Sequence, residues 1–127
     1  MSYLNLIFNK KLTTMKTLLL TLISVLALNS YAQNVNIPDA NFKAYLVANA
    51  LINTNADTEI QVSEATAFGG QIVCANLNIS DLTGIEAFTA LTGLSCAGNQ
   101  LTSLDVSQNT ALTYLICSYN LLTSLDV

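Results

Sequence analysis

A frame of 16 residues occurs twice in this chain, 21 positions apart. Residues 91–106, LTGLSCAGNQLTSLDV, and residues 112–127, LTYLICSYNLLTSLDV, are identical at 11 of 16 positions. A weaker copy precedes them at an offset of 22, with Leu77 in place of the shared asparagine and four apolar positions kept: Ile72, Cys74, Ile79 and Leu82. Repetition at a fixed period indicates that each copy is one structural unit that packs on the next.

The shared frame, L-x-x-L-x-C-x-x-N-x-L-x-x-L, is the leucine-rich-repeat pattern, whose period of about 20–29 residues includes both offsets. A short strand centred on L-x-C points Leu94 and Cys96 inward, because side chains alternate along a strand. Stacked copies then pair their strands in parallel, about 4.8 Å apart. The sequence therefore predicts an α/β solenoid over residues 69–127, with a parallel β-sheet on its concave face and a helical N-terminal cap before it.

Two polar residues are expected inside the predicted coils. Asn99 and Asn120 follow the strands, where a side-chain amide can bond to backbone groups of the bend that would each cost about 1–3 kcal/mol if left unpaired. The return segment is expected to add three further side chains to the core: Leu104, Val106 and Ala111.

Cys74, Cys96 and Cys117 fall on the same inward position of three successive coils. This placement favours a column of small apolar side chains over a metal site, and no zinc-binding spacing is present. Three is an odd number, so at least one thiol is expected to stay free or to pair outside these residues.

Residues 1–32 have the features of a secretory signal peptide, with Met15 as an alternative start. Lys16 precedes the apolar run LLLTLISVLAL, and the small residues Ser30 and Ala32 suit a cleavage site. The run is shorter than the roughly 20 residues that a membrane-spanning helix needs, so no membrane insertion is expected after cleavage. We predict cleavage after Ala32 and a secreted or cell-surface location.

The predicted mature chain, residues 33–127, is acidic. It holds one lysine, Lys43, and eight carboxylates, so its side-chain charge is 1 − 8 = −7. Nucleic acids are poor partners for such a surface. Because the chain contains no histidine or arginine, it lacks the usual general base and the usual phosphate-binding side chain, and an enzyme is not expected.

A helix is predicted within IPDANFKAYLVANALI, residues 37–52. Pro38 suits a first-turn position, and four residues fall near one face: Phe42, Tyr45, Leu46 and Ala50. With the segment that follows it, this helix forms the predicted N-terminal cap, residues 33–68. Such a cap can cover the apolar end of the first coil.

Residues 53–64, NTNADTEIQVSE, can be aligned with the 12-residue calcium loop of an EF-hand. The aligned ligands are Asn53, Asn55, Asp57, Glu59 and Glu64. Thr58 replaces the usual glycine, at a position where a β-branched residue is strained. No cofactor is required, and calcium is the one candidate. The alternative is that residues 53–64 are only a polar connection between the helix and the repeats.

The segments IPDANFKAYL, the calcium-like loop, ISDLTGIEAFTALTGL and LTSLDVSQNTALTYL are similar to secreted, internalin-like leucine-rich-repeat proteins of Bacteroidetes-type bacteria. The similarity covers most of residues 36–127. It implies an array that forms a binding or adhesion surface, ahead of further domains and a C-terminal secretion signal. The family's loop usually carries glycine where this chain has Thr58.

The predicted function is a non-catalytic module that binds a protein or another cell-surface ligand. The expected binding site is the set of residues of the third coil that point outward from the concave face, because this set contains aromatic side chains: Tyr114, Ile116, Ser118 and Tyr119. Two alternatives remain: an accessory targeting region of a secreted enzyme whose catalytic domain lies beyond Val127, and a structural surface spacer. The repeats reach Val127 without a polar capping turn, so we expect the N-terminal part of a longer array.

Overall fold

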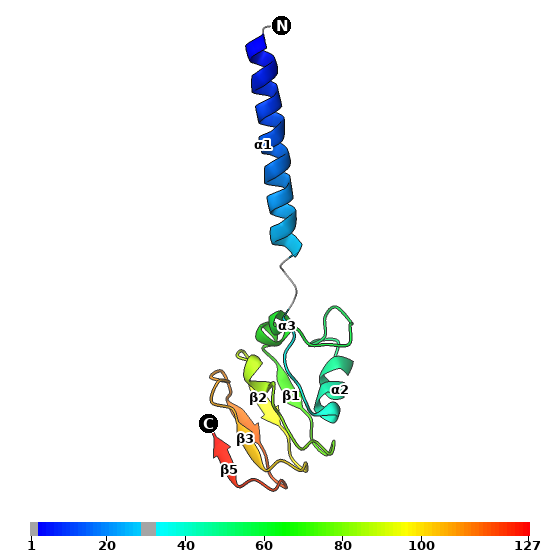
Figure 1. The fold of residues 1–127 in the computed structure, drawn as a ribbon. Coiled ribbons are helices and arrows are strands. Elements are labelled where there is room, and N and C mark those ends of the chain that lie inside the picture. Colours follow the sequence, from blue (N-terminus) through cyan, green and yellow to red (C-terminus); the bar gives the residue numbers. More distant parts are fainter. Residues whose placement is uncertain (1–2, 29–32) are drawn as a thin grey trace. The chain divides into compact units, whose positions relative to one another are not determined.

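The computed structural model describes residues 3–28 and 33–127 (Figure 1). The chain divides into two compact units, residues 1–31 and 32–127. In the first unit, helix α1 spans Tyr3–Leu28. No helix in the described part of the chain is both long and apolar enough to cross a membrane. The predicted cleavage site after Ala32 lies outside the described residues.

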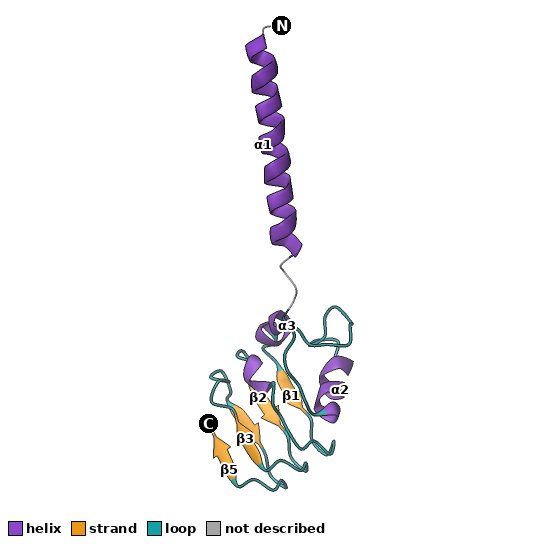
Figure 2. Ribbon diagram, in the orientation of Figure 1, coloured by secondary structure: helices purple, strands orange, loops and turns teal. Residues whose placement is uncertain are grey.

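The second unit combines short helices with short strands (Figure 2). Helices α2 and α3 come first, and a 3-10 helix, η1, lies between the first two strands. The elements are α2 (Ala40–Ala48), α3 (Val62–Ala67), β1 (Gln71–Val73), η1 (Ile85–Ala87), β2 (Gly93–Ser95), β3 (Ser103–Asp105), β4 (Tyr114–Ile116) and β5 (Ser124–Asp126).

The predicted parallel sheet is confirmed in order and register. Strands β1, β2 and β4 pair in that order, and Ile72, Leu94 and Leu115 are aligned across them. These pairings reproduce the sequence offsets of 22 and 21. The register decides which side chains face inward, because a shift of one residue would move every inward side chain of the strand to the outer face.

A second parallel sheet joins β3 to β5, with Leu104 aligned with Leu125. It lies in the return segments, for which the sequence pattern predicted burial but no strand. Leu104 and Val106 are buried as predicted, whereas Ala111 is exposed and adds nothing to the core. Ala111 lies in a turn after Asn109, and Leu112 is the first residue after this turn that packs against the core.

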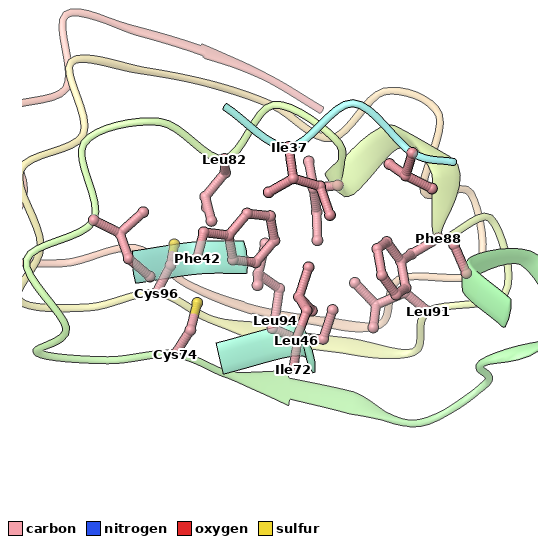
Figure 3. Close-up of a cluster of buried hydrophobic side chains, with 14 of the residues drawn as sticks. Ile37, Phe42, Leu46, Ile72, Cys74, Leu82, Phe88, Leu91, Leu94 and Cys96 are labelled. Atoms are coloured by element: carbon pink, nitrogen blue, oxygen red, sulfur yellow. The ribbon is translucent and has the colours of Figure 1, made fainter. Parts of the chain in front are cut away.

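The core lies inside the coils and extends to the helix that precedes them (Figure 3). Leu94 and Ile72 from the strands meet Phe42 and Leu46 from α2, and all four side chains are completely buried. Burial of one such side chain contributes about 1.5–3 kcal/mol, so this cluster stabilises the contact between α2 and the first coils. Ala50, predicted on the same helix face, is exposed because α2 ends at Ala48.

Asp39 connects the start of α2 to the first coil. One carboxylate oxygen accepts hydrogen bonds from the backbone N–H groups of Asn41 and Phe42, and the other accepts from the N–H and hydroxyl of Ser80. Asp39 is therefore the N-cap, and Pro38 precedes the helix instead of lying in its first turn. The Tyr45 hydroxyl oxygen also accepts the N–H of Val73 on β1, which satisfies one donor on the open edge of that strand.

Asn99 is buried and bonds backward to the preceding coil. Its Oδ1 accepts the N–H groups of Leu77 and Ile79, and its Nδ2 donates to the carbonyls of Cys74 and Cys96. Because the amide of one coil satisfies the bend of the coil before it, the first coil can carry Leu77 where the others have asparagine.

Asn120 repeats this arrangement one coil later. Its Oδ1 accepts the N–H of Leu101, and its Nδ2 donates to the carbonyls of Cys96 and Cys117 at 3.0 Å each. A further buried asparagine, Asn109, donates to the carbonyls of Ile85 and Phe88 from the return side of the coil. Asn109 was not predicted, since its position occurs only once within these residues and the repeat could not reveal it.

Replacement of Asn99 by alanine should lower the free energy of unfolding by about 1–3 kcal/mol, because two N–H groups and the Cys74 carbonyl lose their partner in a buried bend, while the Cys96 carbonyl keeps its bond from Asn120. Ser95→Ala, on the outward side of the neighbouring strand, should change it by less than about 0.5 kcal/mol. Urea unfolding of residues 33–127 measures both. Equal effects of the two substitutions would contradict the role of the Asn99 amide.

Candidate functional site

The outward face of the first sheet carries no charged residue. Its six strand positions are Gln71, Val73, Gly93, Ser95, Tyr114 and Ile116. The carboxylates lie elsewhere: four in residues 39–64, and four on η1, β3, β5 and the turn at Asp81. Lys43, the one basic side chain of residues 33–127, is paired with Glu59 at 2.6 Å. A neutral strip therefore crosses an acidic domain.

The first two coils present small or polar groups on this face. Gly93 precedes the inward Leu94, so alternation along the strand places it outward, but it is buried because the side chain of Gln71 lies across it. A Cβ at Gly93 would come within 2.8 Å of Gln71 Cγ. The glycine thus leaves room for Gln71 and is not itself a contact surface.

The third coil carries larger apolar side chains at the same positions. Tyr114 replaces Gly93 and Ile116 replaces Ser95 across the register of β2 and β4. Tyr114 is 47 % exposed and Tyr119 is 88 % exposed.

Ser118 is exposed and Ile116 is half-buried, so all four predicted binding residues lie on β4 or in the bend that follows it. Leu121, 65 % exposed, extends this group and was missed. Comparison with Gln100, its equivalent 21 residues earlier, could have identified it. We call Tyr114, Ile116, Tyr119 and Leu121 the third-coil patch.

Tyr119 adopts a strained backbone conformation. It has φ 55°, and the equivalent residues of the earlier coils, Asn76 and Gly98, have φ 58° and 67°. Glycine and asparagine tolerate this left-handed region, whereas a tyrosine there costs about 1–2 kcal/mol. Strain of this kind is found most often at functional sites.

The three cysteines form the expected column along the sheet. Cys74 and Cys96 are completely buried and Cys117 is half-buried, and all three thiols are free. Burial, together with the neighbouring cysteine, raises the pKa of Cys74 to about 12 and that of Cys96 to about 11. These two thiols therefore stay protonated at neutral pH and are poor nucleophiles.

The loop between α2 and α3 is closed by the side chain of Glu64. One carboxylate oxygen accepts the N–H groups of Thr54 and Asn55 and the Thr54 hydroxyl, and the other accepts the N–H of Gln61. Burial alone would raise the pKa of Glu64, but these hydrogen bonds lower it below its ordinary value.

The oxygens of the aligned calcium ligands are largely occupied by donors within the loop. Both carboxylate oxygens of Asp57 accept N–H groups, from Glu59 on one side and from Asn55 and Gln61 on the other. Asn55 Oδ1 accepts the N–H of Asp57. Asn53 Oδ1 differs, because it is buried without a hydrogen-bond partner.

The backbone of the loop also departs from the aligned pattern. Ala56, and not Thr58, adopts the left-handed conformation, with φ 58°. Within the described residues, no group of three or more acidic or cysteine side chains is placed to hold a metal ion. A calcium ion would have to displace the N–H donors, and calcium binding stays a prediction.

Comparison with known proteins shows that the repeats are similar to those of internalins. No family model matches the chain. Over 73 residues it is 40 % identical to Internalin J of Listeria monocytogenes serotype 4b (strain F2365), a match that covers 57 % of this chain and 8 % of that protein. The repeats are internalin-like. The match spans only a small part of the length of Internalin J. The Bacteroidetes-type source stays a prediction.

Two solved structures agree with the fold. The functional domain of InlJ from Listeria monocytogenes, which includes a cysteine ladder, matches with a TM-score of 0.63 and 45 % identity, covering 75 % of this chain and 21 % of that one. An internalin, InlF, from Listeria monocytogenes strain 4b F2365 matches with a TM-score of 0.55 and 21 % identity, covering 76 % of this chain and 33 % of that one. The predicted α/β repeat fold is confirmed.

Calcium at a few millimolar should raise the melting temperature of residues 33–127, through binding to the folded state. Glu59 is aligned with the position that contributes its backbone carbonyl, so only Asp57 and Glu64 bring charged side chains and the expected dissociation constant is about 10⁻⁴–10⁻³ M. Calorimetry with and without calcium should show the shift in the parent and none in Glu64→Gln. An unchanged parent would mean that the loop is a connector closed by its own hydrogen bonds.

Acid should destabilise the domain through Glu64 and Asp39. Burial would raise the pKa of Asp39 too, but bonds from Phe42, Ser80 and Asn41 lower it. Because both folded-state pKa values lie below the unfolded ones, about 3.9 for Asp and 4.3 for Glu, this stability is present above about pH 4.3 and is lost as the pH falls further.

Urea unfolding between pH 7 and pH 3 should therefore show a steeper loss of stability in the parent than in Glu64→Gln or Asp39→Asn. Ser124→Ala, which changes an exposed side chain without a charge, is the control and should leave the slope unchanged. Identical slopes for all four proteins would contradict the assignment.

Proposed function

We propose that this chain is a non-catalytic, secreted or surface-displayed module that binds a protein on another cell surface through the third-coil patch. The similarity to internalins supports a recognition module. The observation that carries the choice of surface is the replacement of small and polar outward residues by Tyr114, Ile116, Tyr119 and Leu121 in one coil.

The chemistry of the patch suits a protein partner. Cores of protein interfaces are enriched in tyrosine and depleted of charged residues, and the strip that holds the patch carries no charge. Several apolar side chains close together mark interaction sites more often than single exposed ones do, and here four fall within eight residues of one coil. The same feature favours recognition over a structural spacer, for which an aromatic patch has no use.

We further propose that the coils form the N-terminal end of a solenoid and that α2 and α3 cover its first coil. The bonds of Asp39 to Ser80 and of Tyr45 to Val73, and the burial of Phe42 and Leu46, support this arrangement. An accessory role beside a secreted catalytic domain is the second candidate function. The reading frame downstream of Val127 separates the two.

Adhesion of coated beads to cultured cells tests the proposal. Beads that carry residues 33–127 should adhere, and protease treatment of the cells should abolish adhesion while glycosidase treatment should not. The double variant Tyr114→Ser, Tyr119→Ser should bind at least about 10-fold more weakly, since two anchor residues each contribute about 1 kcal/mol or more. Leu51→Ser is the control: the leucine lies in the loop between α2 and α3 and is 79 % exposed, and the variant should bind like the parent.

Tyr119→Gly separates binding from stability. Glycine relieves the left-handed strain, and Tyr119 buries little of its side chain, so the free energy of unfolding should rise by roughly 1 kcal/mol. Adhesion should fall in the same variant. A loss of stability, or an unchanged adhesion, would contradict the proposal that this strained residue is a binding anchor.

A further inference from the structure

Two rows of outward residues cross the coils with the same order of residue types. The first row follows the register of β1, β2 and β4, and the second lies five positions further along each coil, in the bend. Each row has a primary amide in the first coil, a glycine in the second and a tyrosine in the third: Gln71, Gly93 and Tyr114, then Asn76, Gly98 and Tyr119.

Backbone hydrogen bonds keep the second row in the same register as the strands. The N–H of Asn76 donates to the carbonyl of Ala97 at 2.9 Å. The N–H of Gly98 donates to the carbonyl of Ser118 at 3.0 Å. Asn76, Gly98 and Tyr119 also share the left-handed backbone conformation. The second row is therefore structurally equivalent across the coils, as the first row is.

In both rows the amide side chain of the first coil lies across the glycine of the second coil. A Cβ at Gly93 would come within 2.8 Å of Gln71 Cγ and 3.4 Å of Gln71 Nε2. A Cβ at Gly98 would come within 3.0 Å of Asn76 Cγ. The glycines thus let both amides reach over the second coil, in the direction of the third. Neighbouring strands are about 4.8 Å apart, so an amide over β2 is about one strand spacing from Tyr114.

We propose that Gln71 and Asn76 determine the specificity of the binding surface, by hydrogen-bonding to main-chain peptide groups of an extended segment of the protein partner. This inference rests on the proposed function, because it adds two residues to the surface that holds the third-coil patch. Both side chains are exposed, and each adjoins a tyrosine of the patch through the glycine between them.

A primary amide has the hydrogen-bonding groups that match a peptide group. It donates through its N–H groups and accepts through its oxygen, so it can satisfy both the C=O and the N–H of a main chain. A partner segment that packs its side chains on Tyr114 and Tyr119 loses water from its peptide groups, and each one left unpaired weakens binding. A charged partner group would need a charged residue, and the outward positions of the three strands hold none.

The spacing of the two rows indicates the form of the partner segment. Five residues of extended chain span at most about 17 Å, so a partner segment of about six residues can reach both rows. A helix does not suit this surface, because its N–H and C=O groups are already paired within the helix. The expected partner element is therefore an exposed extended segment or loop.

Adhesion of beads that carry residues 33–127 to the same cultured cells tests this proposal. Gln71→Met keeps the length of the side chain and removes its hydrogen bonds, so adhesion should weaken about 10-fold. Asn76→Gly should weaken adhesion similarly, because glycine keeps the left-handed backbone and lacks the amide. Gln108→Met, the same change at an exposed glutamine in the return segment, is the matched control and should bind like the parent.

Gly93→Ala tests whether the glycine acts through the amide. Its Cβ would displace the Gln71 side chain, so adhesion should fall about as much as in Gln71→Met. The double variant should then bind no more weakly than either single variant. Losses that multiply in the double variant would mean that the two residues act independently, and would contradict the arrangement. Gln71→Met and Asn76→Gly decide the proposal if Gly93→Ala does not fold.

Gln71→Glu tests the chemical class of the partner group. The carboxylate keeps the acceptors and loses the donors, so adhesion should weaken. Tighter adhesion would mean that the partner places a cation at this position, and would overturn the assignment of a peptide group.

The tyrosine variant separates this proposal from the proposed function. If Tyr114→Ser, Tyr119→Ser weakens adhesion while Gln71→Met and Asn76→Gly bind like the parent, the role of the amides is overturned and the proposed function stands. If the tyrosine variant itself binds like the parent, or if the parent does not adhere, the proposed function is overturned and this inference with it.

Discussion

The fold depends on asparagine side chains that hydrogen-bond from one coil to the coil before it. Asn99 serves the bend of the first coil, Asn120 serves that of the second, and Asn109 does the same on the return side. A bend that turns inside a coil leaves N–H and C=O groups away from water, and a neighbouring amide supplies both donor and acceptor. Each coil is therefore complete only when the next one is present, which is why the frame must repeat.

This dependence explains what could be predicted from the sequence. The register of β1, β2 and β4 follows from the offsets of 22 and 21, because the inward residues recur in three copies. The pairing of β3 with β5 and the role of Asn109 could not be predicted, since the return segment occurs only twice and Asn109 only once. Asp39 was missed for a different reason. Its second oxygen bonds to Ser80, 41 residues away, and no local pattern encodes such a contact.

The candidate site was predictable in its position and not in its conformation. Alternation along β4 places Tyr114 and Ile116 outward, but the burial of Gly93 depends on the conformation of Gln71 in the neighbouring coil. The loop at 53–64 has the residue types of a calcium site, while its hydrogen bonds turn the same oxygens toward N–H groups. Residue type alone cannot distinguish a carboxylate that binds a cation from one that caps a helix, as Glu64 does at the start of α3.

The bend at Tyr119 shows how the repeat can carry a binding residue without losing its fold. A left-handed tyrosine costs about 1–2 kcal/mol. In the same bend, the two N–H groups of the Asn120 amide donate to the carbonyls of Cys96 and Cys117, and each bond contributes about 0.5–1.5 kcal/mol. The sum of these bonds is comparable with the strain, so the amide offsets the cost of a tyrosine in this bend. Inward positions are constrained by the neighbouring coil, whereas the position of Tyr119 carries a different residue in each coil. It is asparagine, glycine and tyrosine in three successive coils, and only the last offers a large side chain to a partner.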